Sequence, residues 1–198
     1  EYILSRISTD NRIYITALST ELSVSDDTIR RDLAELDKKG LLTKVHGGAI
    51  AKSGISIQFS ERMNTLTLIK QQMASKLIPL FKERDIILMD GGTTNLEVAR
   101  MLPKDMNLTI YTNCFPIANE LLKHPKVDLI FVGGEVCPSS QVTVGVSVYQ
   151  MLQTVRLDGS IIGVSDLHPL EGLTTSDREE AIIKRTMVEQ GIKRVVIA

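Results

Sequence analysis

The short stretch that begins at Ser25 constrains the fold more than any other part of the chain, because it carries the signals of one particular helix. Ser25 is a favourable N-cap, since its hydroxyl oxygen can accept a hydrogen bond from a free amide of the first helical turn. Ile29 and Leu33 are four residues apart and share an apolar face, so the adjacent Arg30 and Arg31 point away from it. Paired guanidinium groups on an exposed helix suit the DNA major groove, where they can reach phosphates and guanine edges.

The flanking segments extend this helix into a helix-turn-helix followed by a wing. A brief amphipathic segment precedes it, and a tight turn at Val24 separates the two. Two lysines before Gly40 suit the end of the arginine-bearing helix, because cations favour the negative helix end and glycine permits a left-handed stop. The pattern is typical of a winged helix-turn-helix domain. The expected elements are a helix at residues 3–7, a helix at 16–23, the arginine-bearing helix up to Gly40 and a hairpin at 41–50.

The charges of this region decide where it could bind DNA. Residues 1–50 hold seven basic and eight acidic side chains, so no overall positive field draws the segment to nucleic acid, yet five of the seven lie between Arg30 and Lys44. The arginine-bearing helix is expected in the major groove, with the hairpin on the sugar-phosphate backbone. A winged helix that binds only protein, with its arginines in solvent, is an alternative. The residues predicted to bind double-stranded DNA are Ser25, Asp27, Thr28, Arg30, Arg31, Lys44 and His46.

Composition sets the outer limits for the whole chain. Its 198 residues suffice for two domains, 43% of them are hydrophobic, and the net charge is −1. No apolar run approaches the roughly 20 residues that span a bilayer, and no signal-peptide pattern is present, so no membrane partner is expected. Cys114 and Cys137 lack metal-ligand or disulfide-framework spacing, which favours ordinary thiols of a cytoplasmic protein without a metal site or cofactor. Small polar residues indicate a linker at 51–56, after a first domain at 1–50.

Residues 57–198 alternate between strand and helix patterns. Short continuous apolar runs are typical of strands buried on both faces, and the alternation predicts an α/β domain with a mostly parallel sheet. The strand patterns are 86–89, 108–111, 129–132, 161–164 and 195–197. The helical patterns are 67–81, with Ile69, Met73, Leu77 and Leu80 on one face, 94–102, 115–124, and 177–190 with a capping box of Ser176 and Glu179. Valines at 142–148 alternate like a strand but overlap a helix pattern at 148–155.

Polar and glycine-rich turns follow three of these strands. Two glycines let a main chain approach a ligand closely, and threonine hydroxyls with helix amides can hold an anion. The carboxyl ends of parallel strands line one edge of a sheet, where ligands bind in a crevice. Each turn alone also fits plain turn chemistry, but the set favours a small phosphorylated ligand. The turns are Asp90-Gly91-Gly92-Thr93-Thr94, Thr112-Asn113 and Gly133-Gly134.

Several other polar side chains are weaker candidates. Glu180 and Lys184 are four residues apart on one helix, a spacing that fits either a surface ion pair or a ligand contact. No nucleophile motif or metal-ligand cluster accompanies them. The remaining candidates are Asp166, His168 and Asp177 for acid–base chemistry, without partner spacing, and Arg62 and Lys70 for phosphate, although solvated positions explain both.

The chain resembles the DeoR family of bacterial transcriptional regulators over nearly its whole length. In the first domain the resemblance rests on residues 24–33, Leu36, Gly40 and His46-Gly47-Gly48-Ala49. In the second it rests on the three turns and on Gly145, Asp158, Gly172-Leu173-Thr174, Glu180-Ala181 and Lys184-Arg185. The resemblance implies a sensor domain related to sugar-phosphate isomerases, with Gly92, Thr93 and Thr94 around the effector phosphate. The predicted effector-binding residues are Asp90, Gly91, Gly92, Thr93, Thr94, Thr112, Asn113, Gly133, Gly134 and Lys184.

These patterns lead to one main expectation and one alternative. The expected protein is a cytoplasmic bacterial repressor of a carbohydrate-utilisation operon, not an enzyme, whose operator affinity is changed by a phosphorylated sugar or polyol. A homodimer or homotetramer is expected, because two operator half-sites need two protomers. Family members continue past the last strand, so the domain at 57–198 is expected to lack its C-terminal end. The alternative is a sugar-phosphate isomerase or deaminase with an accessory N-terminal domain, which needs a carboxylate and a lysine placed for proton abstraction.

Overall fold

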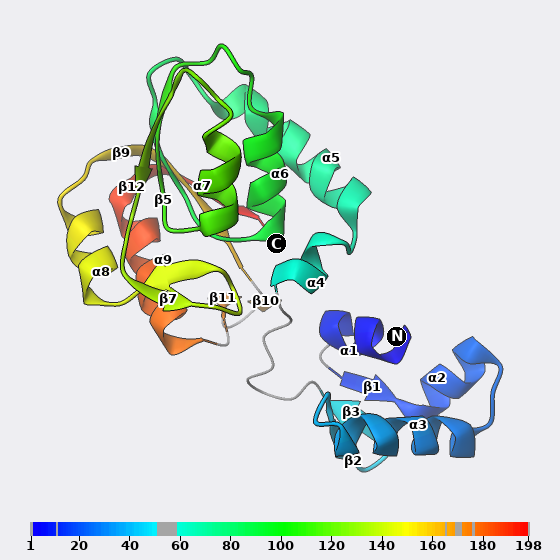
Figure 1. Cartoon of the computed structure of the whole chain (residues 1–198). Helices are drawn as coiled ribbons and strands as arrows, with labels where there is room; N and C mark the ends of the chain where they lie inside the picture. Colours follow the sequence, from blue (N-terminus) through cyan, green and yellow to red (C-terminus); the bar gives the residue numbers. More distant parts are fainter. Residues whose placement is uncertain are drawn as a thin grey trace. The chain divides into compact units, whose positions relative to one another are not determined.

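The chain divides into two units, Glu1–Ile57 and Gln58–Ala198, each with its own core (Figure 1). The structure is a computed structural model that describes residues 2–10, 12–50, 59–164, 166–168, 172–175 and 177–197. The linker expected at 51–56 lies outside the described residues. The two units are therefore considered one at a time.

The N-terminal unit is a winged helix-turn-helix, as the sequence predicts. Its helices pack around a small apolar core that includes Ile7, Leu18, Ile29 and Leu33. A three-stranded antiparallel sheet of order β1-β3-β2 completes it. The elements are α1 (Tyr2–Asp10), β1 (Arg12–Tyr14), α2 (Ile15–Leu22), α3 (Asp26–Lys38), β2 (Thr43–Val45) and β3 (Gly48–Ile50).

Helix α3 begins and ends where its sequence signals place it. The Ser25 hydroxyl accepts a hydrogen bond from the Thr28 amide at 3.2 Å, which caps the helix. At the other end Gly40 has φ +73°, and its amide donates to the Asp37 carbonyl while the Leu41 amide donates to the Leu36 carbonyl. This is a Schellman motif, and it turns the chain directly into the wing.

The second unit is built on a five-stranded parallel sheet of order β12-β9-β4-β5-β6, which confirms the α/β fold. Two antiparallel hairpins, β7-β8 and β10-β11, accompany it. The strands are β4 (Ile86–Met89), β5 (Leu108–Thr112), β6 (Val127–Phe131), β7 (Glu135–Cys137), β8 (Val142–Val144), β9 (Leu157–Gly163), β10 (Asp166–His168), β11 (Gly172–Thr174) and β12 (Gly191–Ile197). The helices are α4 (Phe59–Met63), α5 (Thr67–Leu77), a 3₁₀ turn (Ile78–Leu80), α6 (Thr93–Met101), α7 (Phe115–Leu121), α8 (Val146–Gln153) and α9 (Arg178–Gln190).

The order of the strands fixes where a ligand crevice can form. The chain runs from β4 outward to β5 and β6 in one direction, but from β9 to β12 in the other. Because parallel crossovers are right-handed, α6 and α7 cover one face of the sheet and α9 covers the other, as Figure 1 shows. The reversal lies between β4 and β9, and a crevice at their carboxyl ends is the usual ligand site of such a sheet.

Three local predictions need correction. The helix expected at 67–81 ends at Leu77, because Pro79 lies in a 3₁₀ turn, and its expected apolar face is wrong at Ile69 and Leu80, which are about half exposed. The N-cap of α9 is Asp177, whose side chain accepts from the Glu180 amide, while the predicted cap Ser176 lies outside the described residues.

The unassigned valines belong to two elements in succession. Strand β8 covers Val142 to Val144, and α8 starts at Val146. Between them Gly145 has φ +92°, a backbone conformation that favours glycine and ends the strand.

Candidate functional site

The face of α3 opposite the core presents the residues predicted to bind DNA. Ile29 and Leu33 are buried, whereas Asp27, Thr28, Arg30 and Arg31 are exposed. Arg30 forms an ion pair with Asp27, with Nη1 2.8 Å from Oδ1, and a longer one with Asp26 at 3.9 Å. Arg31 has no side-chain partner among the described residues, so it is the freer of the two cations.

The wing supplies the other two predicted contacts. Lys44 on β2 and His46 in the turn after it are both exposed. Gly47 has φ +79°, which a glycine adopts easily, and its carbonyl accepts from the Ile15 amide at 2.9 Å. A side chain at Gly48 would collide with the Ile13 carbonyl of the neighbouring strand β1, so the glycine pair lets the wing close on the domain.

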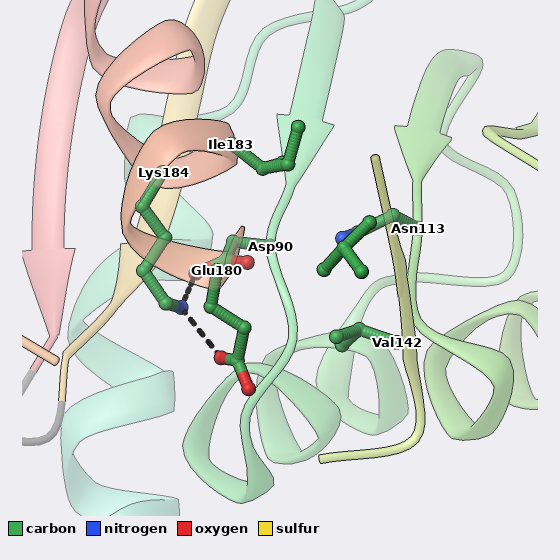
Figure 2. A pocket seen from close by; sticks show the side chains of 7 residues that line it. Asp90, Asn113, Val142, Glu180, Ile183 and Lys184 are labelled. Carbon is green, nitrogen blue, oxygen red and sulfur yellow. Dashed lines mark hydrogen bonds and ion pairs between the residues drawn. The ribbon is translucent and has the colours of Figure 1, made fainter. Parts of the chain in front are cut away.

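At the carboxyl ends of β4 and β9, an ion pair occupies the point where the strand order reverses (Figure 2). Lys184 on α9 donates to Asp90 Oδ2 at 2.5 Å and to the Gly163 carbonyl at 2.8 Å. The Gly163 amide donates to the same Asp90 oxygen at 3.0 Å. The side chains of Asp90 and Lys184 are only 3% and 14% exposed, so the pair is an internal one.

Glu180 lies one turn before Lys184 and faces the same space (Figure 2). Its Oε2 is 3.9 Å from Lys184 Nζ, while Oε1 accepts from the Ser140 hydroxyl and from Cys137 Sγ. The i to i+4 pair is therefore not a surface ion pair, because both side chains are largely buried.

A narrow pocket lies between these groups and the end of β5. It is too narrow to hold a water molecule, and its lining combines charged groups with an apolar wall. The Asn113 Nδ2 donates to the Thr143 carbonyl at 2.7 Å, but its Oδ1 is buried without a partner among the described residues. A buried acceptor without a donor is costly, so this oxygen is suited to a ligand hydroxyl. The lining residues are Asp90, Asn113, Val142, Val144, Glu180, Ile183 and Lys184.

The loop after Asp90 leads into α6 in a conformation that needs its glycines. Gly92 has φ +140°, and a side chain at Gly91 would collide with Val142. Thr93 is buried and Thr94 half-buried in the first turn of α6, where free amides favour an anion.

Among the remaining predicted effector residues, Thr112 and Gly134 have structural contacts. The Thr112 hydroxyl is buried and accepts from the Cys114 amide at 3.2 Å. Gly134 packs so closely that a side chain would meet the Val144 carbonyl at 2.6 Å, and Gly133 is exposed. Neither glycine lines the pocket, and close packing accounts for Gly134 but not for Gly133, where a side chain would meet open space.

The weaker candidates from the sequence differ in their structural positions. Asp177 caps α9, and the side chains of Asp166 and His168 lie outside the described set. Arg62 and Lys70 were expected in solvent, but both are half-buried. Burial lowers the pKa of each, and the nearby carboxylate of Glu180 acts in the opposite sense on Arg62. Sequence reasoning missed Gly163 and Ser140, whose contacts join segments far apart in the chain.

Models of known protein families match both units of the chain. The DeoR-like helix-turn-helix domain model matches residues 1–54, and the DeoR C-terminal sensor domain model matches residues 67–198. The chain belongs to the DeoR family. The resemblance read from the sequence is confirmed, and this DeoR-family chain is a transcriptional regulator with a DNA-binding domain and a sensor domain, rather than an enzyme.

Individual relatives agree with the family model. The chain is 32% identical to the lactose phosphotransferase system repressor of Staphylococcus epidermidis, over 89% of this chain and 72% of that protein. It is 30% identical to the HTH-type transcriptional regulator GlpR of Haloferax volcanii, over 99% and 77%. Ribose 5-phosphate isomerase A of Methanocaldococcus jannaschii aligns with 66% of this chain and 51% of its own at 14% identity, with a TM-score of 0.45, which supports no conclusion.

The part of the chain that the structure describes offers neither a membrane-spanning helix nor a metal site. No helix there is long and apolar enough to cross a membrane. No group of three or more His, Cys, Asp or Glu side chains there could hold a metal ion.

Proposed function

We propose that this regulator represses a carbohydrate-utilisation operon and that a phosphorylated sugar or polyol in the sensor domain changes its affinity for operator DNA. The names of relatives support the repressor role, since one is a lactose phosphotransferase system repressor. The groups at the strand-order reversal support the proposal for the effector, because the buried Asn113 acceptor lines the pocket there and Asp90 of the same lining leads through the glycine-rich loop into the first turn of α6. The pocket has to widen to admit such a ligand, since no water molecule fits into it as it stands.

The chemistry of that pocket and of the adjoining glycine-rich loop favours a phosphorylated polyol over other small molecules. The free amides at the start of α6 and the hydroxyls of Thr93 and Thr94 suit a phosphoryl group. The unpaired Asn113 oxygen and the Glu180 carboxylate are acceptors, which suit sugar hydroxyls as donors. An apolar effector would leave these groups unpaired and would bind weakly.

The direct test is fluorescence anisotropy of the full chain on DNA from upstream of its own operon, at fixed salt. We expect specific binding that one member of a panel of sugar and polyol phosphates weakens by about 5- to 150-fold, the usual range of coupling between two sites. Binding indifferent to the whole panel contradicts the effector class. Absence of binding even at low salt contradicts DNA recognition and favours the protein-binding alternative.

Two sets of variants assign the two functions to the two sites. Arg30→Ala and Arg31→Ala should weaken operator binding, whereas Lys39→Ala, which removes an exposed cation paired with Glu35, should not. Thr93→Phe should abolish the effector response without abolishing DNA binding, because the bulky ring fills the first turn of α6. A normal response from a folded Thr93→Phe protein would remove that loop from the site.

The functional form is proposed to be a homodimer or homotetramer. One α3 helix reads only a few base pairs, so recognition of two half-sites needs two copies. Light scattering after size exclusion, alone and with operator DNA, measures the stoichiometry. A single protomer per operator at saturation would contradict the proposal.

A further inference from the structure

The side chain of Arg62 on α4 is charged and half-buried, and its hydrogen bonding is incomplete. Its Nε is buried and has no partner among the described residues. The guanidinium carbon lies 5.9 Å from the centre of the Phe59 ring, which holds the side chain in place. No described carboxylate lies within ion-pair distance of it, so the charge is not neutralised by contact.

A second cation lies beside it. Lys70 Nζ donates a hydrogen bond to the main-chain carbonyl of Arg62, and the positive charge of Arg62 contributes to lowering the pKa of Lys70. The carboxylates whose charges act on the two cations, Glu180 and Glu97, already have other partners. Glu180 is bonded to Ser140 and Cys137, and Glu97 pairs with Arg100 at 2.5 Å. Two half-buried like charges without committed counterions are unfavourable unless an anion joins them.

The position of Arg62 connects it to the effector pocket. The Phe59 amide donates to the Ser139 carbonyl at 2.9 Å, which fixes α4 beside the segment that binds Glu180. Helix α4 also packs against α6, the helix that follows the glycine-rich loop, and the Glu180 carboxylate opposes the lowering of the Arg62 pKa by burial. Cys114 follows Asn113 at the end of β5 and lies against Gly91. Arg62 therefore belongs to a helix that packs beside both the segment bonded to Glu180 and the helix that follows the glycine-rich loop.

We propose that Arg62, with Lys70 beside it, binds the phosphoryl group of the effector together with the amides of the Gly92–Thr94 turn. Lys184 has a different role in this assignment, because Asp90 already neutralises it and holds it at 2.5 Å. Arg62 can offer two parallel N–H donors to a phosphoryl group, a geometry that lysine lacks. The assignment rests on the proposed function, since it names the cation that recognises the same effector.

The test measures ligand-induced thermal shifts of the full chain. The ligands are inorganic phosphate, a panel of sugar and polyol phosphates, and the unphosphorylated parent of each. The variants are Arg62→Met, which keeps the packing length without the charge, Arg62→Lys, which keeps the charge without the fork, and Arg156→Met. Arg156 is exposed just before the amino end of β9, at the opposite end of the sheet, so its variant controls for loss of one positive charge.

Two results are expected together for Arg62→Met, one for its stability and one for its affinity. Arg62→Met should melt no lower than the wild type without ligand, because an uncompensated charge is gone, and should bind the phosphorylated ligand at least tenfold more weakly. Arg62→Lys should retain intermediate affinity, and Arg156→Met should bind as the wild type does. An equal response of Arg62→Met and wild type overturns the role of Arg62 alone. Absence of any wild-type response overturns the effector class on which it depends.

A folding defect does not leave the question open. If Arg62→Met melts too low to be titrated, Arg62→Lys decides, because it keeps the positive charge in the half-buried site. Undiminished affinity of Arg62→Lys for every phosphorylated ligand then overturns the proposal. A loss restricted to phosphorylated ligands, with unphosphorylated parents unaffected, supports it.

Discussion

Replacing Lys184 by methionine should destabilise the sensor unit far more than removing an ordinary ion pair. Methionine keeps most of the side-chain volume, so the change removes the ammonium group and little else. The variant loses the bonds from Nζ to Asp90 and to the Gly163 carbonyl. It leaves the Asp90 carboxylate, 3% exposed, with the Gly163 amide as a remaining donor.

The size of the effect follows from that burial. Removing one partner of a buried ion pair costs about 3–5 kcal/mol, because the other charge stays desolvated. We expect a value near the lower limit, about 3 kcal/mol, since Lys184 is 14% exposed and Gly163 still donates to Asp90. For a unit of this size, that corresponds to a fall in melting temperature of roughly 6–12 °C.

Differential scanning calorimetry of the full chain is the appropriate assay, because two units can unfold in separate transitions. Lys123→Met is the matched control, since this lysine is 58% exposed in its pair with the partly buried Glu120, and its loss should cost less than about 1 kcal/mol. The double variant with Asp90→Asn and Lys184→Met should lose less stability than the sum of the losses in the two single variants. If Lys184→Met lowers the melting temperature of the sensor unit no more than Lys123→Met does, the buried ion pair does not have the stabilising role argued above.

Three further expectations concern single side chains. Arg31→Ala should lower the salt dependence of operator binding by about one unit of slope if the guanidinium contacts a phosphate, measured by anisotropy across a salt series; an unchanged slope and affinity would contradict the contact. Burial lowers the pKa of His124 below 6.5, and the positive charge of Lys104 adds a smaller effect in the same direction. The unfolded state therefore binds the proton more readily than the folded state, so the folded protein loses stability as the pH falls below 6.5. His124→Phe should flatten this loss in acid melting curves, and an equal acid slope in both proteins would refute it. Burial raises the pKa of Cys114 to about 11, so its thiol should resist alkylation near neutral pH until the protein unfolds, and rapid labelling of the folded protein would show that it is accessible.

The elements that could be predicted from the sequence are those whose signals are local. Helix α3 is an example, because its cap at Ser25, its apolar spacing and its stop at Gly40 lie within one short segment. The buried strands of the sheet were also found, because each is a continuous apolar run between turns. Strand β1 was missed, since only Ile13 of its three residues is buried and its partner β3 lies far along the chain.

The candidate site also has a part with local sequence signals and a part that depends on contacts between distant residues. Its loop at Asp90 to Thr94 could be predicted, because a strand, two glycines and a helix start follow one another directly. The pairing of Asp90 with Lys184 could not, since 94 residues separate the partners and only the crossover to β9 and α9 brings them together. The burial of Arg62 has the same origin, because it depends on the contact of α4 with Ser139.

The charges of the N-terminal unit support the proposal that operator binding uses more than one copy of the chain. Arg30 is held by Asp27 in an exposed pair worth less than about 1 kcal/mol, so exchanging that carboxylate for a phosphate is easy but contributes little. Residues 1–50 carry no net positive charge, which limits the affinity of one unit for DNA. Linking two units makes the second binding event intramolecular and can raise affinity by about 10²–10⁴. A monomeric form that binds the operator as tightly as the oligomer would therefore require DNA contacts beyond those of α3 and the wing.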